Sequence, residues 1–182
     1  ISSFGLTFRI HLEVTFMEPL IAWVFWTLVT IDPNHSLLDG FDKRTVDGKH
    51  VISLGEAYVD NQTVGSELQY VNYQPYAYGP LQPIYGISST EKGGTMFGAG
   101  VGYEYKFSDK LFLESSFLPG LYIKNDDTDL GKQPFFRAKL GLGYRFSKSF
   151  SASISYDHRS NGRVNGVNPG METLQANIGF HY

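Results

Sequence analysis

The sequence predicts an all-β fold, an eight-stranded antiparallel up-and-down transmembrane β-barrel, and three observations support this prediction. After residue 50 the chain consists of runs of about 10 to 14 residues that are separated by clusters of turn residues. Within the clearest runs, apolar side chains alternate with glycine or charged side chains, which is the period of a β-strand. The connections between runs are alternately tight and longer. Eight antiparallel runs can close on themselves, which leaves no exposed sheet edge.

The turn clusters fix the positions of the expected strands. The eight runs are residues 51–60, 65–77, 81–90, 94–107, 110–124, 133–147, 149–160 and 171–182. The tight connections lie at 79–80, 108–109 and 148, and the longer ones at 89–93, 125–132 and 161–170. Short turns on one side of the membrane and longer loops on the other are the pattern of bacterial outer-membrane barrels.

Runs 94–107 and 133–147 show the alternation most clearly. In 94–107 one face carries Phe97, Ala99, Val101, Tyr103, Tyr105 and Phe107, and the other carries glycines, Glu104 and Lys106. A soluble barrel also alternates, but it buries its apolar face and exposes its charges to water. Here Tyr and Phe gather near strand ends, as a membrane interface requires, and glycine with charges of both signs suits a narrow lumen. We therefore prefer a membrane barrel, with a soluble lipid-binding barrel as the alternative.

Two segments compete for the place of the first strand. Residues 4–16 alternate perfectly, whereas residues 51–60 alternate weakly but keep the hairpin spacing uniform. We prefer 51–60 for that spacing. Residues 51–182 are thus expected to form the barrel, and residues 1–50 an N-terminal extension.

The extension contains the longest apolar run of the chain, residues 19–31. This run is shorter than the roughly 20 residues that a helix needs to cross a bilayer. It has the length of the apolar part of an export signal, but its flank carries little positive charge and no clear cleavage site. We interpret it as a degenerate export signal, followed by a linker at 34–50; an extra strand or a packed segment is the alternative.

Composition excludes several classes of function. The net charge is −3 without a basic cluster, which argues against nucleic-acid binding because phosphate contacts need clustered Lys and Arg. The chain has no Cys, so disulfides, thiolate metal sites and thiol nucleophiles are excluded. His11, His35, His50 and His181 show no metal-ligand spacing with each other or with carboxylates, and we expect neither a metal nor a cofactor.

Three polar residues occupy positions where the alternation calls for lipid-facing side chains. His158 and Ser160 continue the apolar parity of strand 149–160, and Glu172 shares the parity of the apolar residues in strand 171–182. The hairpin through 161–170 is expected to bring Glu172 opposite or diagonal to His158 and Ser160 at the extracellular end. Their neighbours Asp157 and Arg159 face the lumen, where we expect them to pair with Glu114, Arg137 or Lys139 and to have no catalytic role.

Together the three side chains match the needs of a serine hydrolase. Such an enzyme requires a hydroxyl, a base that activates it, a carboxylate that orients the base, and donors for the oxyanion. Ser160, His158 and Glu172 supply the first three, and Asn161 or nearby loop N–H groups the last. Each residue alone is more often an ordinary strand-end or turn residue, but three polar groups at one membrane depth are costly unless they are used.

These residues give the sequence a resemblance to a known family, the outer-membrane lipid A 3-O-deacylases (PagL-like acyloxyacyl hydrolases). The matching motif is H-x-S-N at residues 158–161, with Glu172 fourteen residues after the His and N-P-G-M at 168–171 between them. The segments SSFLPGLY (115–122) and FRAKLGLGYRF (136–146) extend the resemblance over roughly residues 65–182.

The resemblance implies an eight-stranded barrel in the bacterial outer membrane that hydrolyses the 3-O-linked hydroxyacyl ester of lipid A. It implies Ser160 as nucleophile, His158 as base, Glu172 as the group that orients the base, and Asn161 as part of the oxyanion site. Lipid A within lipopolysaccharide is then the partner, and because homodimers occur in the family, a homodimer is a further expectation. The alternative from another class is a non-catalytic barrel, acting as an anchor, adhesin or small pore, in which the three residues are idle.

Overall fold

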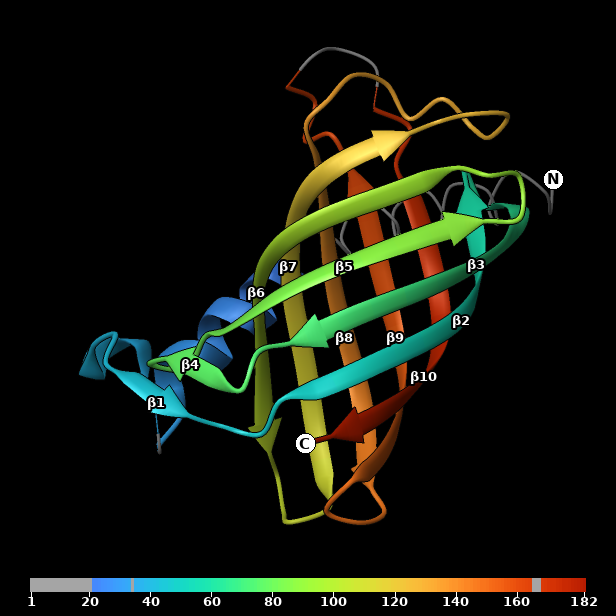
Figure 1. The fold of residues 1–182 in the computed structure, drawn as a ribbon. Coiled ribbons are helices and arrows are strands. Elements are labelled where there is room, and N and C mark those ends of the chain that lie inside the picture. Colours follow the sequence, from blue (N-terminus) through green and yellow to red (C-terminus); the bar gives the residue numbers. More distant parts are fainter. Residues whose placement is uncertain (1–20, 34, 165–167) are drawn as a thin grey trace, which may run out of the picture.

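In the computed structural model, residues 21–33, 35–164 and 168–182 are described, and eight of their strands close into an antiparallel barrel (Figure 1). The barrel strands are β2 (Lys49–Val59), β3 (Gln62–Tyr73), β5 (Gln82–Thr90), β6 (Thr95–Lys106), β7 (Leu111–Ile123), β8 (Phe135–Arg145), β9 (Phe150–Ser160) and β10 (Met171–His181). Each strand pairs with its neighbours in the chain, and β10 pairs with β2 to complete the circle. The predicted fold class is therefore confirmed.

The first barrel strand is the segment that hairpin spacing favoured. β2 begins at Lys49 and ends at Val59, one residue before the end of the expected run 51–60, whereas residues 4–16 lie outside the described residues. β2 turns into β3 through Asp60 and Asn61, which both have positive φ, as a two-residue hairpin turn requires. β3 ends four residues before the expected 77, because Pro75 has no N–H for a ladder and residues 76–78 form a separate strand.

The outer wall of the barrel is apolar. Its exposed residues include Ile52, Leu54, Leu68, Phe97, Phe117, Leu142, Ile154, Leu174 and Ile178. The inner positions of the same strands carry charged or polar residues that are almost fully buried. A soluble protein has the opposite arrangement, so this wall faces lipid.

The lumen is filled by buried charges at two levels. At the upper level Arg137 contacts both Glu67 at 2.6 Å and Asp157 at 2.7 Å, and Arg159 is hydrogen-bonded to Glu67. Asp157 thus pairs with Arg137 as expected. Arg159 instead pairs with Glu67 of β3, and not with Glu114, the carboxylate expected from the sequence.

At the lower level Glu114 lies 3.3 Å from both Lys49 and Lys139. Lys49 also contacts Glu104 at 3.0 Å. Buried ions are tolerated only when they are paired in this way, because each alone would lose its hydration without compensation.

Above the upper charges, an apolar cluster packs at the end of the lumen near the β9–β10 hairpin. Its buried residues are Ala57, Val59, Met96, Tyr122, Leu130, Phe135 and Met171. Leu130 comes from the connection between β7 and β8, so this loop folds inward over the barrel end.

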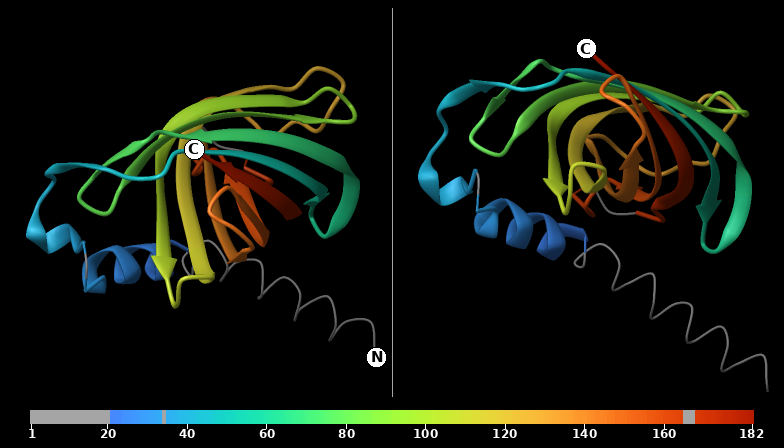
Figure 2. Two further views of the ribbon diagram at one scale, coloured as in Figure 1. Left: turned by 60° about the horizontal axis from the view of Figure 1, so that its bottom comes forward. Right: turned by 90° about the horizontal axis from the view of Figure 1, so that it is seen from below.

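The described part of the N-terminal extension packs against the outside of the barrel near β6 (Figures 1 and 2). Residues 21–31 are helical, with Val29 buried and Trp23 and Trp26 exposed. The hydroxyl of Tyr103 on β6 donates to Asp32 Oδ2 at 2.9 Å. No helix among the described residues has the length and apolarity to cross a membrane. The described part of the run 19–31 is thus a packed segment, and its role as an export signal stays a prediction.

A short two-stranded sheet links this extension to the barrel. The 3-10 helix η1 (Leu37–Asp39) leads to β1 (Lys43–Thr45), which pairs with β4 (Tyr76–Tyr78) outside the barrel. The linker expected at 34–50 therefore contains short regular elements where the structure describes it, and its last residues begin β2.

Candidate active site

His158 on β9 and Glu172 on β10 form a direct cross-strand pair on the outer wall. The register places Glu172 opposite His158, which is the closer of the two arrangements that the sequence allowed. Both residues share the strand face of apolar neighbours that point to lipid, Ile154 on β9 and Leu174 on β10. The side chains are hydrogen-bonded, with 3.0 Å between His158 Nδ1 and Glu172 Oε1.

This pair is shielded although it belongs to the outer face. His158 and Glu172 are each only 8% exposed. With Nδ1–H directed to the carboxylate, the neutral ring keeps Nε2 as its basic nitrogen. Shielding from water strengthens the interaction between an imidazole and a carboxylate, and a carboxylate on Nδ1 also stabilises the ring when Nε2 takes a proton.

Gly170 packs against the edge of the imidazole that carries Nε2. Its φ is +73°, and a Cβ at this position would lie 2.8 Å from His158 Cε1 and 3.4 Å from His158 Nε2. Only glycine therefore combines this backbone conformation with the close approach. Gly170 belongs to the N-P-G-M segment that was part of the family resemblance. The alternation of apolar and polar residues did not predict its contact with His158.

Ser160 is the last residue of β9 and lies on the same outer face. It is paired with Phe136 of β8, whose ring stacks on exposed Phe117 at 5.8 Å between centroids. The backbone N–H of Gly162 donates to Ser160 Oγ at 3.4 Å. Ser160 and His158 are two residues apart on one face, a backbone separation of about 6.5–7 Å that an imidazole and a hydroxymethyl group can span.

The side chain of Asn161 is fully buried and held by two loops. Its Nδ2 donates to the carbonyl of Leu130 at 3.4 Å, and its Oδ1 accepts from the N–H of Arg163 at 2.9 Å. Its own N–H donates to Asn168 Oδ1 at 3.0 Å. These contacts order the turn that follows Ser160, and a role for Asn161 at the oxyanion stays a prediction. The sequence predicted that backbone N–H groups of this loop lie near Ser160 without saying which ones. The structure identifies the N–H of Gly162 as one of them.

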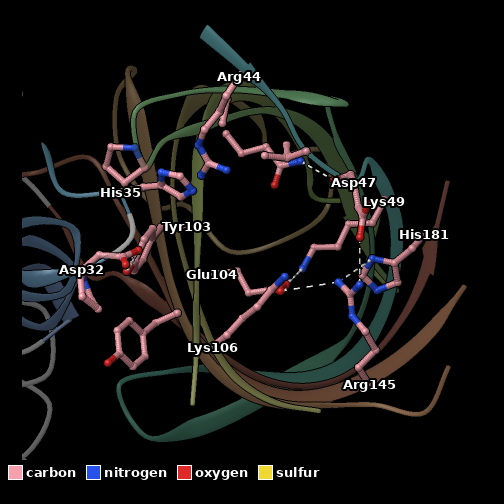
Figure 3. A pocket seen from close by; sticks show the side chains of 16 residues that line it. Asp32, His35, Arg44, Asp47, Lys49, Tyr103, Glu104, Lys106, Arg145 and His181 are labelled. Atoms are coloured by element: carbon pink, nitrogen blue, oxygen red, sulfur yellow. Dashed lines mark hydrogen bonds and ion pairs between the residues drawn. The ribbon is translucent and has the colours of Figure 1, made fainter. Parts of the chain in front are cut away.

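A cavity of about 360 Å³ lies at the opposite end of the barrel and contains none of these residues (Figure 3). Charges on its lining pair with one another: Lys49 with Glu104 at 3.0 Å, and Arg145 with Asp47 at 3.0 Å. The cavity is therefore separate from the candidate site. Within residues 21–33, 35–164 and 168–182, no three His, Asp or Glu residues form a metal-binding group.

The apolar outer wall, the charged lumen and a polar site on the lipid face define an outer-membrane β-barrel. A family model, lipid A 3-O-deacylase (PagL), matches residues 49–181. The chain belongs to the lipid A 3-O-deacylase family, as the resemblance in the sequence predicted, and its location is the outer membrane.

Solved structures support the same fold. The crystal structure of the outer membrane enzyme PagL is similar at a TM-score of 0.57 and 16% identity, over 72% of this chain and 98% of that one. The N-terminal β-barrel domain of Pseudomonas aeruginosa OprF is similar at a TM-score of 0.55 and 15% identity, over 76% of this chain and 100% of that one. Neisserial surface protein A is similar at a TM-score of 0.52 and 12% identity, over 78% of this chain and 99% of that one. At these identities the likeness concerns the fold alone. Comparison with curated protein sequences gave no match.

Proposed function

We propose that this protein is an esterase of the outer membrane that hydrolyses the 3-O-linked hydroxyacyl ester of lipid A by a Ser-His-Glu mechanism. Ser160 is the nucleophile, His158 the general base and Glu172 the carboxylate that orients the base. The observation that carries the proposal is the 3.0 Å hydrogen bond between His158 Nδ1 and Glu172 Oε1 on the lipid face. An acid–imidazole pair on that face, two residues from a serine, has no evident structural purpose in lipid.

The reaction follows from these positions. Ser160 Oγ attacks the ester carbonyl while His158 Nε2 accepts the hydroxyl proton, and Glu172 stabilises the imidazolium. The N–H of Gly162 and the side-chain amide of Asn161 are the proposed donors for the oxyanion of the tetrahedral intermediate. Collapse of this intermediate breaks the bond between the acyl carbon and the 3-oxygen of lipid A. The departing oxygen takes the proton from His158 and becomes the 3-hydroxyl, and the acyl group remains on Ser160 as an acyl-serine. Water, deprotonated by the same base, then releases the hydroxy fatty acid and restores Ser160.

The position of the site suits an amphiphilic substrate. The tight turns after β6 and β8 and the C-terminal end of β10 lie at one end of the barrel, and the β9–β10 hairpin lies at the other (Figure 1). The longest connections of the barrel, from β7 to β8 and from β9 to β10, lie at the same end as Ser160. Long loops are extracellular in outer-membrane barrels, which puts Ser160 at the level of the outer leaflet. Lipid A can then approach sideways with its acyl chains still in lipid, and the ester does not have to cross the charged lumen.

The experiment is mass spectrometry of lipid A from cells that express wild-type protein or single variants. Wild type is expected to remove one hydroxyacyl group, and Ser160→Ala and His158→Ala are expected to leave lipid A intact. The control is Ser151→Ala, because Ser151 on the same strand forms a hydrogen-bonded Ser–His pair in the lumen, with its Oγ 2.8 Å from His181 Nε2. Ser151→Ala should deacylate like wild type. Deacylation by Ser160→Ala would reject the mechanism, and intact lipid A with wild type would favour a non-catalytic barrel.

A further inference from the structure

The lumen-facing neighbours of the three proposed catalytic residues converge on one side chain. Arg159 stands between His158 and Ser160 on β9, and it is hydrogen-bonded to Glu67. Thr173 follows Glu172 on β10, and its hydroxyl donates to Glu67 Oε2 at 3.3 Å. Because alternate residues of a strand face opposite sides, each of these contacts lies directly behind the outer site.

The third lumen-facing neighbour, Asp157, is connected to Glu67 indirectly, through Arg137. Asp157 precedes His158 and accepts from Arg137 Nη2 at 2.7 Å. The guanidinium of Arg137 in turn binds both oxygens of Glu67, at 3.1 Å and 2.6 Å. The side chains of Glu67, Asp157 and Arg159 have no exposed surface, and that of Arg137 is 3% exposed.

Glu67 reaches these groups from across the barrel. It belongs to β3, and the strand order puts β3 opposite β8 in the closed circle, with β9, β10 and β2 on the path between them. A carboxylate that binds residues of β8, β9 and β10 from the far wall therefore fixes how these strands are placed relative to each other. Charge-assisted and bidentate bonds of this kind are short and directional.

We infer that Glu67 is a positioning residue for deacylation: through Arg159 and Thr173 it fixes the placement of Ser160 and His158 relative to Glu172. This inference rests on the proposed function. Glu67 does not touch the reacting atoms, and it acts by holding the inner neighbours of residues whose mutual geometry sets the rate.

Removal of the Glu67 charge affects Arg159 more than Arg137. Arg137 keeps Asp157 as a counter-ion, whereas among the ion pairs of the described residues Arg159 has only Glu67. A buried guanidinium without a counter-ion is forced to move toward other acceptors or water. Since Arg159 is bonded through the backbone to His158 and Ser160, this movement disturbs both.

The lower charge cluster provides a matched control. Glu114 is also buried and binds two cations, Lys49 and Lys139, each at 3.3 Å, together with the hydroxyl of Ser153 at 2.7 Å. Without Glu114, Lys49 would keep Glu104 and Lys139 would lose its carboxylate. The two substitutions Glu67→Gln and Glu114→Gln thus perturb equivalent ion clusters. Ser153, however, is seven residues before Ser160, or about 23 Å along an extended strand.

The test measures kcat and KM for purified lipid A in detergent, on protein whose folding is verified by heat-modifiable gel migration. Glu67→Gln is expected to lower kcat by roughly 10- to 100-fold, since displacements near 1 Å have effects of that size, with KM within about twofold. Glu114→Gln should leave both constants within about twofold of wild type. The rate at which a fluorophosphonate labels Ser160 should fall in Glu67→Gln in the same proportion as kcat.

A compensating variant separates positioning from loss of stability. In Glu67→Gln with Arg159→Gln, the charge without a counter-ion is gone and two amides face each other, so kcat should recover in part. A purely destabilising effect would instead increase with the second substitution. Equal losses of kcat in Glu67→Gln and Glu114→Gln would overturn the inference, and so would a Glu67→Gln enzyme with wild-type kcat. An active Ser160→Ala variant would refute the proposed function, whereas wild-type kcat in Glu67→Gln beside an inactive Ser160→Ala refutes only the role of Glu67.

Discussion

Replacement of Gly170 by alanine should lower activity through a contact with one atom of the imidazole. A Cβ at Gly170 would lie 2.8 Å from His158 Cε1, and ordinary contacts begin near 3.4 Å. The imidazole or the loop must therefore move by about 0.6 Å, the difference between these distances. The Oε1 of Glu172 is hydrogen-bonded to Nδ1, the ring atom next to Cε1, so movement of the ring also disturbs that hydrogen bond.

The magnitude follows from this displacement. A misplacement of 1 Å can cost about 100-fold in rate, so a shift of about 0.6 Å corresponds to roughly tenfold in kcat. The substitution also forces a non-glycine residue into the left-handed region at φ +73°, which costs about 1–2 kcal/mol of stability. Gly93→Ala is the matched control, because Gly93 has φ +85° and a Cβ there meets nothing nearer than 3.7 Å.

The assay compares both variants with wild type for stability in urea and for the rate of deacylation of purified lipid A. Gly170→Ala and Gly93→Ala are expected to lose similar stability, but only Gly170→Ala should lose activity. A folded Gly170→Ala protein with the wild-type rate would refute the reasoning, because the imidazole would then tolerate the contact without consequence.

Three further outcomes are expected. Glu172→Gln should fold normally but deacylate at least ~100-fold more slowly, since an amide cannot stabilise charged His158 as the carboxylate does. Measurement of kcat checks this. A nearly unchanged kcat would exclude the orienting role of Glu172. Tyr103→Phe removes the hydroxyl that binds Asp32, so the amides of helix 21–31 should exchange their hydrogens faster, as mass spectrometry of deuterium uptake would detect, while deacylation is unchanged. Chelation by EDTA in detergent should leave the rate unchanged, because the proposed mechanism uses side chains alone; a loss that Mg²⁺ or Ca²⁺ restores would contradict it.

Local alternation was sufficient to predict the barrel strands and the face on which the three polar residues lie. His158, Ser160 and Glu172 were recognisable because period two assigns each residue of a strand to one side without knowledge of its neighbours. The direct pairing of His158 with Glu172 also depends on the length of the loop at 161–170. From the sequence, Glu172 could lie either opposite His158 or diagonal to it.

The remaining features depend on geometry that strand periodicity does not contain. The contact of Gly170 with His158 follows from a positive φ at the end of a loop, and the Gly162 donor follows from the turn after Ser160. The partner of Arg159 is Glu67, 92 residues earlier in the chain, and only closure of the barrel brings the two together. For the segment 21–31, its apolar composition suits an export signal and a packed helix equally well.

The lumen has a consequence for the permeability of the cell envelope. Ion pairs cross it at two levels, and the cluster around Leu130 and Phe135 packs over one end. Solutes that diffuse through wide barrels would have to break these pairs, so an increase in the amount of this protein should not increase the entry of small antibiotics. Under the proposed function, a cell would change its surface lipid by making more of this barrel without opening a new path for hydrophilic drugs.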